Sequence, residues 1–114
     1  MVNLNPFISH NKIELTIQVD QVDVDVNKSL YIGLLINELV INSIKHAFLN
    51  QTFRQINISI KNKKSFLEIN YNDNGVGVVD GSQVKLISTL SRQLEAKYTI
   101  ENRDGFCYCA EIKI

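Results

Sequence analysis

Four polar residues with the means to do chemistry lie close together in an otherwise apolar segment, residues 28–48. Glu38, Asn42, Lys45 and His46 supply a carboxylate, an amide, an ammonium and an imidazole. At about 100° per residue of an α-helix, the first three fall within about 60° of one another, and His46 lies at the edge of that arc. Such a stripe is commonly a solvated helix face with an i, i+3 pair. Since apolar residues surround it, the wall of a pocket is an equally good interpretation: Tyr31, Leu34, Leu35 and Ile41.

A second candidate is a carboxylate followed by two glycines, in the stretch Asp73-Asn74-Gly75-Val76-Gly77. It follows an alternating segment that predicts a strand. Glycine permits backbone conformations and close approaches that other residues resist. Taken alone, the stretch is a weak indication, because turns commonly have this composition.

The two cysteines, Cys107 and Cys109, lie two residues apart in a segment that alternates like a strand. Neighbours at i and i+2 share a strand face, but a bridge between them has poor geometry. A single Cys-x-Cys pair is at best half of a metal site. We therefore expect two reduced thiols and a reducing compartment, the cytosol.

Length and charge narrow the functional classes. The 114 residues suit one domain, and twelve basic residues balance twelve acidic ones. Bulk charge therefore gives this domain no attraction to nucleic acid or to a membrane surface. No apolar run approaches the ~20 residues of a membrane span, and the first residues do not resemble a signal peptide. Residues 1–11 are polar and irregular, and we expect a linker there, with the domain at 12–114.

Hydrophobic periodicity predicts the elements that position these residues. We expect a strand at 13–17, a second short strand or strand-like segment at 22–26, and then a helix at about 28–48 capped by Asn27. Next come strands at 56–60 and 67–71, a loop at 73–82, a helix at about 83–95 and two strands around Asp104-Gly105. This order favours an α+β fold, a two-layer α/β sandwich whose mixed, mostly antiparallel sheet carries helices on one face.

For two of these elements the pattern predicts which residues share a face. The helix at 28–48 is apolar on nearly every side, which is typical of a buried helix. Its core face is expected to hold Ile32, Ile36, Leu39, Val40, Ile44 and Ala47. On the last strand, one face is expected to carry Tyr108, Ala110, Ile112 and Ile114.

Residues 37–48, NELVINSIKHAF, closely resemble the N box of the ATP-binding domains of sensor histidine kinases. These domains belong to the superfamily shared with gyrase, a heat-shock chaperone and mismatch-repair ATPases. The stretch from Asp73 to Gly77 resembles the first glycine box, and residues 86–114 resemble the last helix and closing hairpin. The resemblance covers about residues 12–114 and implies the Bergerat-type ATPase fold.

The resemblance implies a role for each candidate at the phosphate end of a nucleotide site. Asn42 would ligate Mg²⁺ through its side-chain oxygen, and Mg²⁺ would bridge the phosphates of ATP. Lys45 and His46 would donate hydrogen bonds to phosphate oxygens. Glu38 would be the catalytic group that orients or deprotonates the attacking nucleophile.

At the other end of the site, Asp73 would accept a hydrogen bond from the adenine amino group, while Gly75 and Gly77 shape the pocket. The implied reaction transfers the γ-phosphoryl group of ATP to a histidine on a separate dimerisation and phosphotransfer domain of the same parent protein. A response regulator would act downstream. The implied location is the cytosol, in a parent that can be membrane-anchored.

The sequence departs from this family at the second glycine box. Gln83 stands where the family carries its most important glycine, and Gly81 replaces it only if the loop is shifted. A side chain at this position would crowd the phosphates or block a backbone that presents N–H donors. Only residues 78–82 separate Gly77 from Gln83, which leaves almost no room for a lid over the nucleotide. No helical hairpin with an acceptor histidine precedes residue 12, and His10 lies in an irregular stretch.

Three functions therefore stay open. The first is an active kinase catalytic domain, favoured by the intact N box and first glycine box. The second is a degenerate domain that binds ATP weakly or not at all and acts as a protein-docking module, favoured by Gln83. The third is a free-standing ATP hydrolase, which the missing lid disfavours.

Overall fold

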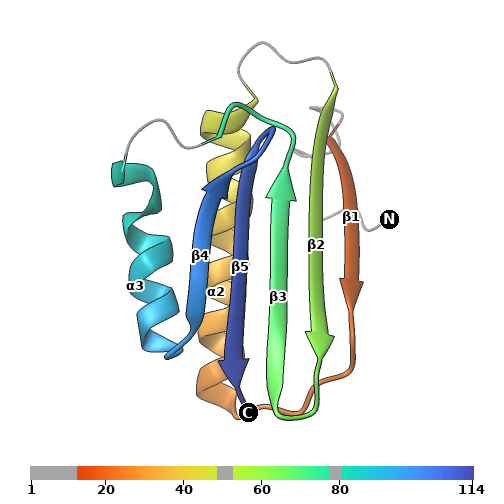
Figure 1. The fold of residues 1–114 in the computed structure, drawn as a ribbon, viewed down its shortest axis with the longest axis vertical. Helices are drawn as coiled ribbons and strands as arrows, with labels where there is room; N and C mark the ends of the chain where they lie inside the picture. Colours follow the sequence, from red (N-terminus) through yellow and green to blue (C-terminus); the bar gives the residue numbers. More distant parts are fainter. Residues whose placement is uncertain (1–12, 49–52, 78–80) are drawn as a thin grey trace.

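One five-stranded sheet carries both helices on a single face (Figure 1). The computed structural model describes residues 13–48, 53–77 and 81–114. Its strands, in sheet order β1-β2-β3-β5-β4, are β1 (Ile13–Val19), β2 (Arg54–Asn62), β3 (Phe66–Asp73), β5 (Phe106–Lys113) and β4 (Lys97–Asn102). The helices are α2 (Val26–Asn42) and α3 (Lys85–Gln93). A π-helical turn (Ser43–Ala47) continues α2, and a 3₁₀ turn (Gly81–Val84) precedes α3.

The sheet is mixed, as predicted. β1 pairs with β2 in parallel, starting at Ile13 opposite Arg54, and the other three pairings are antiparallel. Because side chains alternate between faces, the apolar member of each pair points to the helices. The resulting core draws on all strands except β4 for its fully buried residues and includes Leu15, Ile56, Ile58, Leu67, Ile69, Tyr71, Tyr108, Ala110 and Ile112.

The predicted strand at 22–26 is wrong. Val22 and Val24 pack half-buried against the core without pairing to another strand, and Val26 is the first residue of α2. Asp25, and not Asn27, caps this helix, because its carboxylate accepts a hydrogen bond from the backbone N–H of Lys28 at 2.8 Å. The alternation of valine and aspartate arises because the segment that connects β1 to α2 packs its valines against the core and exposes its aspartates.

The long helix is less buried than predicted. Val26, Leu30 and Leu34 are 83 %, 58 % and 46 % exposed, so α2 packs on the sheet with one side only. Of the predicted core face, Leu39, Val40 and Ala47 are buried and the three isoleucines are half-buried against the core: Ile32, Ile36 and Ile44. The α-helical part ends at Asn42, earlier than expected, because the wider π-helical turn takes over at Ser43.

The closing hairpin is confirmed. Asp104 and Gly105 both have positive φ, 52° and 137°, between β4 and β5. A Cβ on Gly105 would come within 2.0 Å of the carbonyl oxygen of Asp73, so the hairpin packs directly on the end of β3. Of the residues predicted to share one face of the last strand, Tyr108, Ala110 and Ile112 belong to β5, whereas Ile114 lies one residue beyond its end.

The remaining predictions concern the N-terminal segment, the short segment between the glycine boxes, membrane spans and the two cysteines. The predicted linker at residues 1–11 and most of the short segment at 78–82 lie outside the described residues. In the described ranges no helix is both long and apolar enough to cross a membrane. Cys107 is a half-buried free thiol and Cys109 an exposed one. Partial desolvation is the main cause that raises the pKa of Cys109; the charges of Cys107, Glu101 and Glu68 add to this rise, and that of Arg103 opposes it.

Candidate functional site

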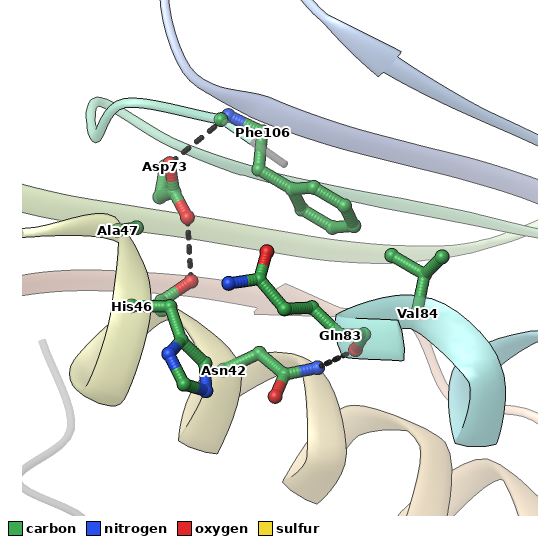
Figure 2. Close-up of a pocket in the computed structure, with 9 residues that line it drawn as sticks. Asn42, His46, Ala47, Asp73, Gln83, Val84 and Phe106 are labelled. Carbon is green, nitrogen blue, oxygen red and sulfur yellow. Dashed lines mark hydrogen bonds between the residues drawn. The ribbon is translucent and has the colours of Figure 1, made fainter. Parts of the chain in front are cut away.

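A small pocket lies where the C-terminal end of α2 meets the end of β3, the start of β5 and the first turn before α3 (Figure 2). The cavity itself is very small, about 20 Å³, far below the range of about 300–1,000 Å³ that small-molecule sites usually occupy. Residues from the two motifs and from the 3₁₀ turn line it together: Asn42, Ser43, His46, Ala47, Asp73, Gly77, Gln83, Val84 and Phe106.

Asp73 lies at the base of this pocket and is only 5 % exposed. Its Oδ1 accepts hydrogen bonds from the backbone N–H groups of Gly75 at 2.9 Å and Phe106 at 3.0 Å. Its Oδ2 accepts one from the Ser43 hydroxyl at 2.6 Å. One carboxylate therefore fastens the glycine loop, the β4–β5 hairpin and the end of α2 to the tip of β3.

Ser43 extends this network into the core, to the hydroxyl of Tyr71, which it contacts directly. The Tyr71 hydroxyl also donates to the backbone carbonyl of Leu39 at 3.0 Å. Burial strongly raises the pKa of Tyr71; the hydrogen bond with Ser43 opposes this rise, and the charge of Asp73 adds to it. This phenol therefore stays a neutral hydrogen-bonding group under ordinary conditions.

Sequence reasoning missed Ser43 and Tyr71 as members of the site. A signal was present, since Tyr71 continues the inward-facing row of Leu67 and Ile69, where a hydroxyl requires a partner. Nothing in the pattern says which residue supplies it. The contact depends on how far the helix end is rotated, and the π-helical turn sets that rotation.

Asn42 faces the pocket from α2 and is bound to the turn that precedes α3. Its side-chain Nδ2 donates to the backbone carbonyl of Gln83 at 2.7 Å. Because a carbonyl only accepts, this contact fixes which side of the amide holds the nitrogen. The Asn42 oxygen consequently points away from Gln83 and is the atom that could ligate a metal ion.

Only part of the polar stripe faces the pocket. His46 lines the pocket, whereas the half-buried Glu38 and the exposed Lys45 are absent from its lining. For Lys45 the reason is the π-helical turn, which places more residues in each turn than the 3.6 assumed from the sequence. Angles counted across Ser43 at the α-helical pitch therefore misplace Lys45 relative to Asn42.

Both glycines of the first motif have a steric role. A Cβ on Gly75 would lie 2.4 Å from the Cβ of Ala47, so the loop packs against the end of the long helix. The backbone N–H of Val76 donates to the Ala47 carbonyl at 2.9 Å in the same contact. Gly77 lines the pocket and has a φ of 84°, a conformation that favours glycine. Gly81, by contrast, has open space where a Cβ would be.

The side chains present fit part of a nucleotide–metal site. Mg²⁺ commonly takes few protein oxygen ligands and completes its shell with phosphates and water, so the Asn42 oxygen could contribute to such a shell. Within the described ranges, no cluster of three or more His, Cys, Asp or Glu residues offers a metal site of its own. The carboxylate of Asp73 adds an acceptor at the other end of the pocket.

Comparison with known proteins identifies this fold as that of histidine kinase catalytic domains. The chain is similar to the blue-light activated histidine kinase of Erythrobacter litoralis, with a TM-score of 0.80 and 21 % identity over 93 % of this chain. It is similar to the catalytic domain of the histidine kinase ThkA, in a nucleotide-free form, with a TM-score of 0.72 and 18 % identity over 94 % of this chain. A third similar structure is the Acinetobacter baumannii histidine kinase AdeS, with a TM-score of 0.73, 14 % identity and 93 % of this chain covered.

The share of each known structure that is covered differs. The chain spans 37 % of the Erythrobacter kinase and 56 % of AdeS, but 83 % of the ThkA catalytic domain. No protein-family model matches the sequence, and no curated protein matches it in a sequence comparison. The similarity is therefore one of fold, shared with the catalytic part of these kinases.

Proposed function

We propose that this chain is the ATP-binding catalytic domain of a two-component sensor histidine kinase. The observation that carries the proposal is that Asn42 and Asp73, one from each motif, face the same pocket at the end of β3. The kinase catalytic-domain fold supports it. In this proposal Asn42 ligates Mg²⁺ and Asp73 recognises adenine.

The hydrogen bonding of Asp73 leaves room for this recognition. A carboxylate offers about four acceptor positions. Gly75, Phe106 and Ser43 use three of them, two on Oδ1 and one on Oδ2. The fourth position, on Oδ2, is available to a donor such as the adenine amino group. Because Asp73 is held by three partners, it would not need to reorganise when a ligand binds.

At the opposite end, bound Mg²⁺ would neutralise phosphate charge. The proposed role of His46, which lines the pocket and is exposed, is to donate to a phosphate oxygen. Lys45, the residue before His46, lies outside the pocket lining. It would reach the phosphates through its long side chain. Glu38, one turn before Asn42, would orient the histidine of the partner domain as it attacks.

The partner required by this function is a dimerisation and phosphotransfer domain that carries the acceptor histidine, with a response regulator downstream. The γ-phosphoryl group passes from the β-phosphate oxygen of ATP to an imidazole nitrogen of that histidine, and ADP leaves with the broken bond's electron pair. The full-length parent should therefore form phosphohistidine from labelled ATP.

Calorimetric titration tests the nucleotide site directly. The domain is titrated with ATP, with and without Mg²⁺, alongside Asn42→Ala and a matched control, Asn37→Ala, on the exposed side of α2. Binding that requires both Mg²⁺ and Asn42, and that Asn37→Ala leaves unchanged, supports the proposal. No heat up to millimolar ATP, from protein shown to be folded by circular dichroism, overturns it.

A second candidate is the degenerate docking module. The small pocket and the contact between Asn42 and Gln83 favour it, because both reduce the space for phosphates. This alternative predicts that the full-length parent binds its response regulator as tightly with Asn42→Ala as without it, and forms no phosphohistidine.

A further inference from the structure

Gln83 occupies an unusual position for a glutamine in a short surface turn. Its neighbours Gly81 and Ser82 are exposed, whereas Gln83 is half-buried and lines the pocket. Its side chain extends into the space between Asn42 at the end of α2, His46 in the π-helical turn and the strand residues Asp73 and Phe106 (Figure 2). The turn is therefore oriented so that this one side chain fills the centre of the candidate site.

The backbone of the same residue holds it there. The Gln83 carbonyl accepts a hydrogen bond from Asn42 Nδ2 at 2.7 Å, which joins the turn before α3 to α2. The contact also engages the side chain that the proposed function assigns to Mg²⁺. Gln83 thus contacts one ligand-binding residue through its backbone and fills the space beside the others with its side chain.

The chemistry of the side chain suits this environment. A carboxamide presents an N–H donor beside an oxygen acceptor, and adenine presents an amino donor beside a ring-nitrogen acceptor. A glutamine in the pocket can therefore offer the same kinds of group to the polar residues of the site that a purine would offer. Because it is covalently attached, it competes at a high effective concentration.

We infer that Gln83 is a specificity-determining residue that occupies the pocket in the absence of ligand, so that an adenine nucleotide binds only after this side chain leaves. The inference rests on the proposed function. If the occupied state outweighs the open state ten to one, the apparent dissociation constant is about tenfold weaker than that of an open pocket. A tenfold change corresponds to about 1.4 kcal/mol.

Two alanine variants and one binding assay test this inference. Gln83→Ala removes the side chain but keeps the carbonyl that accepts from Asn42. Gln93→Ala is the matched control, because Gln93 is an exposed glutamine at the other end of α3. Both variants and the parent sequence are titrated calorimetrically with Mg²⁺·ATP and with adenosine, after circular dichroism has shown that each is folded.

The expected result is about tenfold tighter binding of Mg²⁺·ATP and of adenosine by Gln83→Ala, with Gln93→Ala unchanged. Equal affinities in all three proteins would overturn the role of Gln83 and leave the proposed function standing. Weaker binding by Gln83→Ala would also overturn it, by making the side chain a ligand contact. If none of the folded proteins binds nucleotide, both the proposed function and this inference are wrong.

Discussion

Replacing Asp73 separates its part in the fold from its part in binding. Asp73→Ala removes three hydrogen bonds at once and leaves the buried N–H of Phe106 and the hydroxyl of Ser43 without this acceptor. An unsatisfied buried polar group costs about 1–3 kcal/mol. Gly75 is only partly buried and can reach water, so its N–H adds less. The expected loss in the free energy of unfolding is about 3–4 kcal/mol.

Asp73→Asn should cost far less, because the network can reverse its direction. The amide oxygen still accepts from Phe106 and Gly75. The new amide nitrogen donates to Ser43, whose hydroxyl turns to Tyr71, and Tyr71 still donates to the Leu39 carbonyl. Hydrogen bonds to a charged acceptor exceed neutral ones by about 1 kcal/mol each, but the charge also costs free energy to bury. The net expected loss is about 1 kcal/mol.

Urea unfolding of the two variants, followed by circular dichroism, measures both values from the shift in midpoint at constant slope. The reasoning is refuted if Asp73→Asn is destabilised as much as Asp73→Ala. It is equally refuted if alanine costs less than about 1 kcal/mol, because the three hydrogen bonds would then contribute little. Ser43→Ala serves as control, and it should make the asparagine and aspartate forms more nearly equal.

Three further predictions concern packing and titration. Gly75→Ala should lower the free energy of unfolding by about 2 kcal/mol or more in urea, because the new Cβ would lie 2.5 Å from the Ala47 carbonyl oxygen. Burial raises the pKa of Tyr108 to about 12, against the opposing hydrogen bond with Ser91. Its unfolded pKa is about 10, so the associated stability is complete below pH 10. The free energy of unfolding measured in urea should fall between pH 10 and 12, by up to about 2.7 kcal/mol, and Tyr108→Phe should reduce that fall. Leu30→Ser should change thermal stability by less than about 0.5 kcal/mol, since Leu30 is 58 % exposed, and a larger loss would show that α2 is covered there.

The sheet and its order of elements could be predicted because alternation is a local property. The spacing of apolar residues in β2 and β3 predicts one buried face, and the structure confirms that its residues are buried: Ile56, Ile58, Leu67 and Ile69. Alternation at Val22 and Val24 gave a false strand for the same reason, since the pattern records burial on one side but not a pairing partner. Hydrogen-bond partners far apart in the chain decide between these outcomes.

The sequence was enough to predict which motifs form the candidate site. It was not enough to predict which of their residues contact one another. Asn42, His46, Asp73 and Gly77 were singled out from the sequence and lie around one pocket. Glu38 and Lys45 fall outside its lining, and for Lys45 the reason is the π-helical turn that begins directly after Asn42. No residue type in that segment dictates such a turn, and a helical pattern is drawn at one fixed pitch.

The turn and the buried network have a common cause in the packing around Ser43. A hydroxyl at this position must find partners once the helix end is buried, and it finds them in Asp73 and Tyr71 on β3. The same rotation directs Ala47 against the glycine loop. Both motifs are therefore held to one strand end by the hydrogen bonds of Asp73 and the close packing of Ala47 on Gly75, while Gln83 lines the pocket beside them. It follows that the stability of this end of the domain and the affinity of its pocket can be changed separately, the first through Ser43 and the second through Gln83.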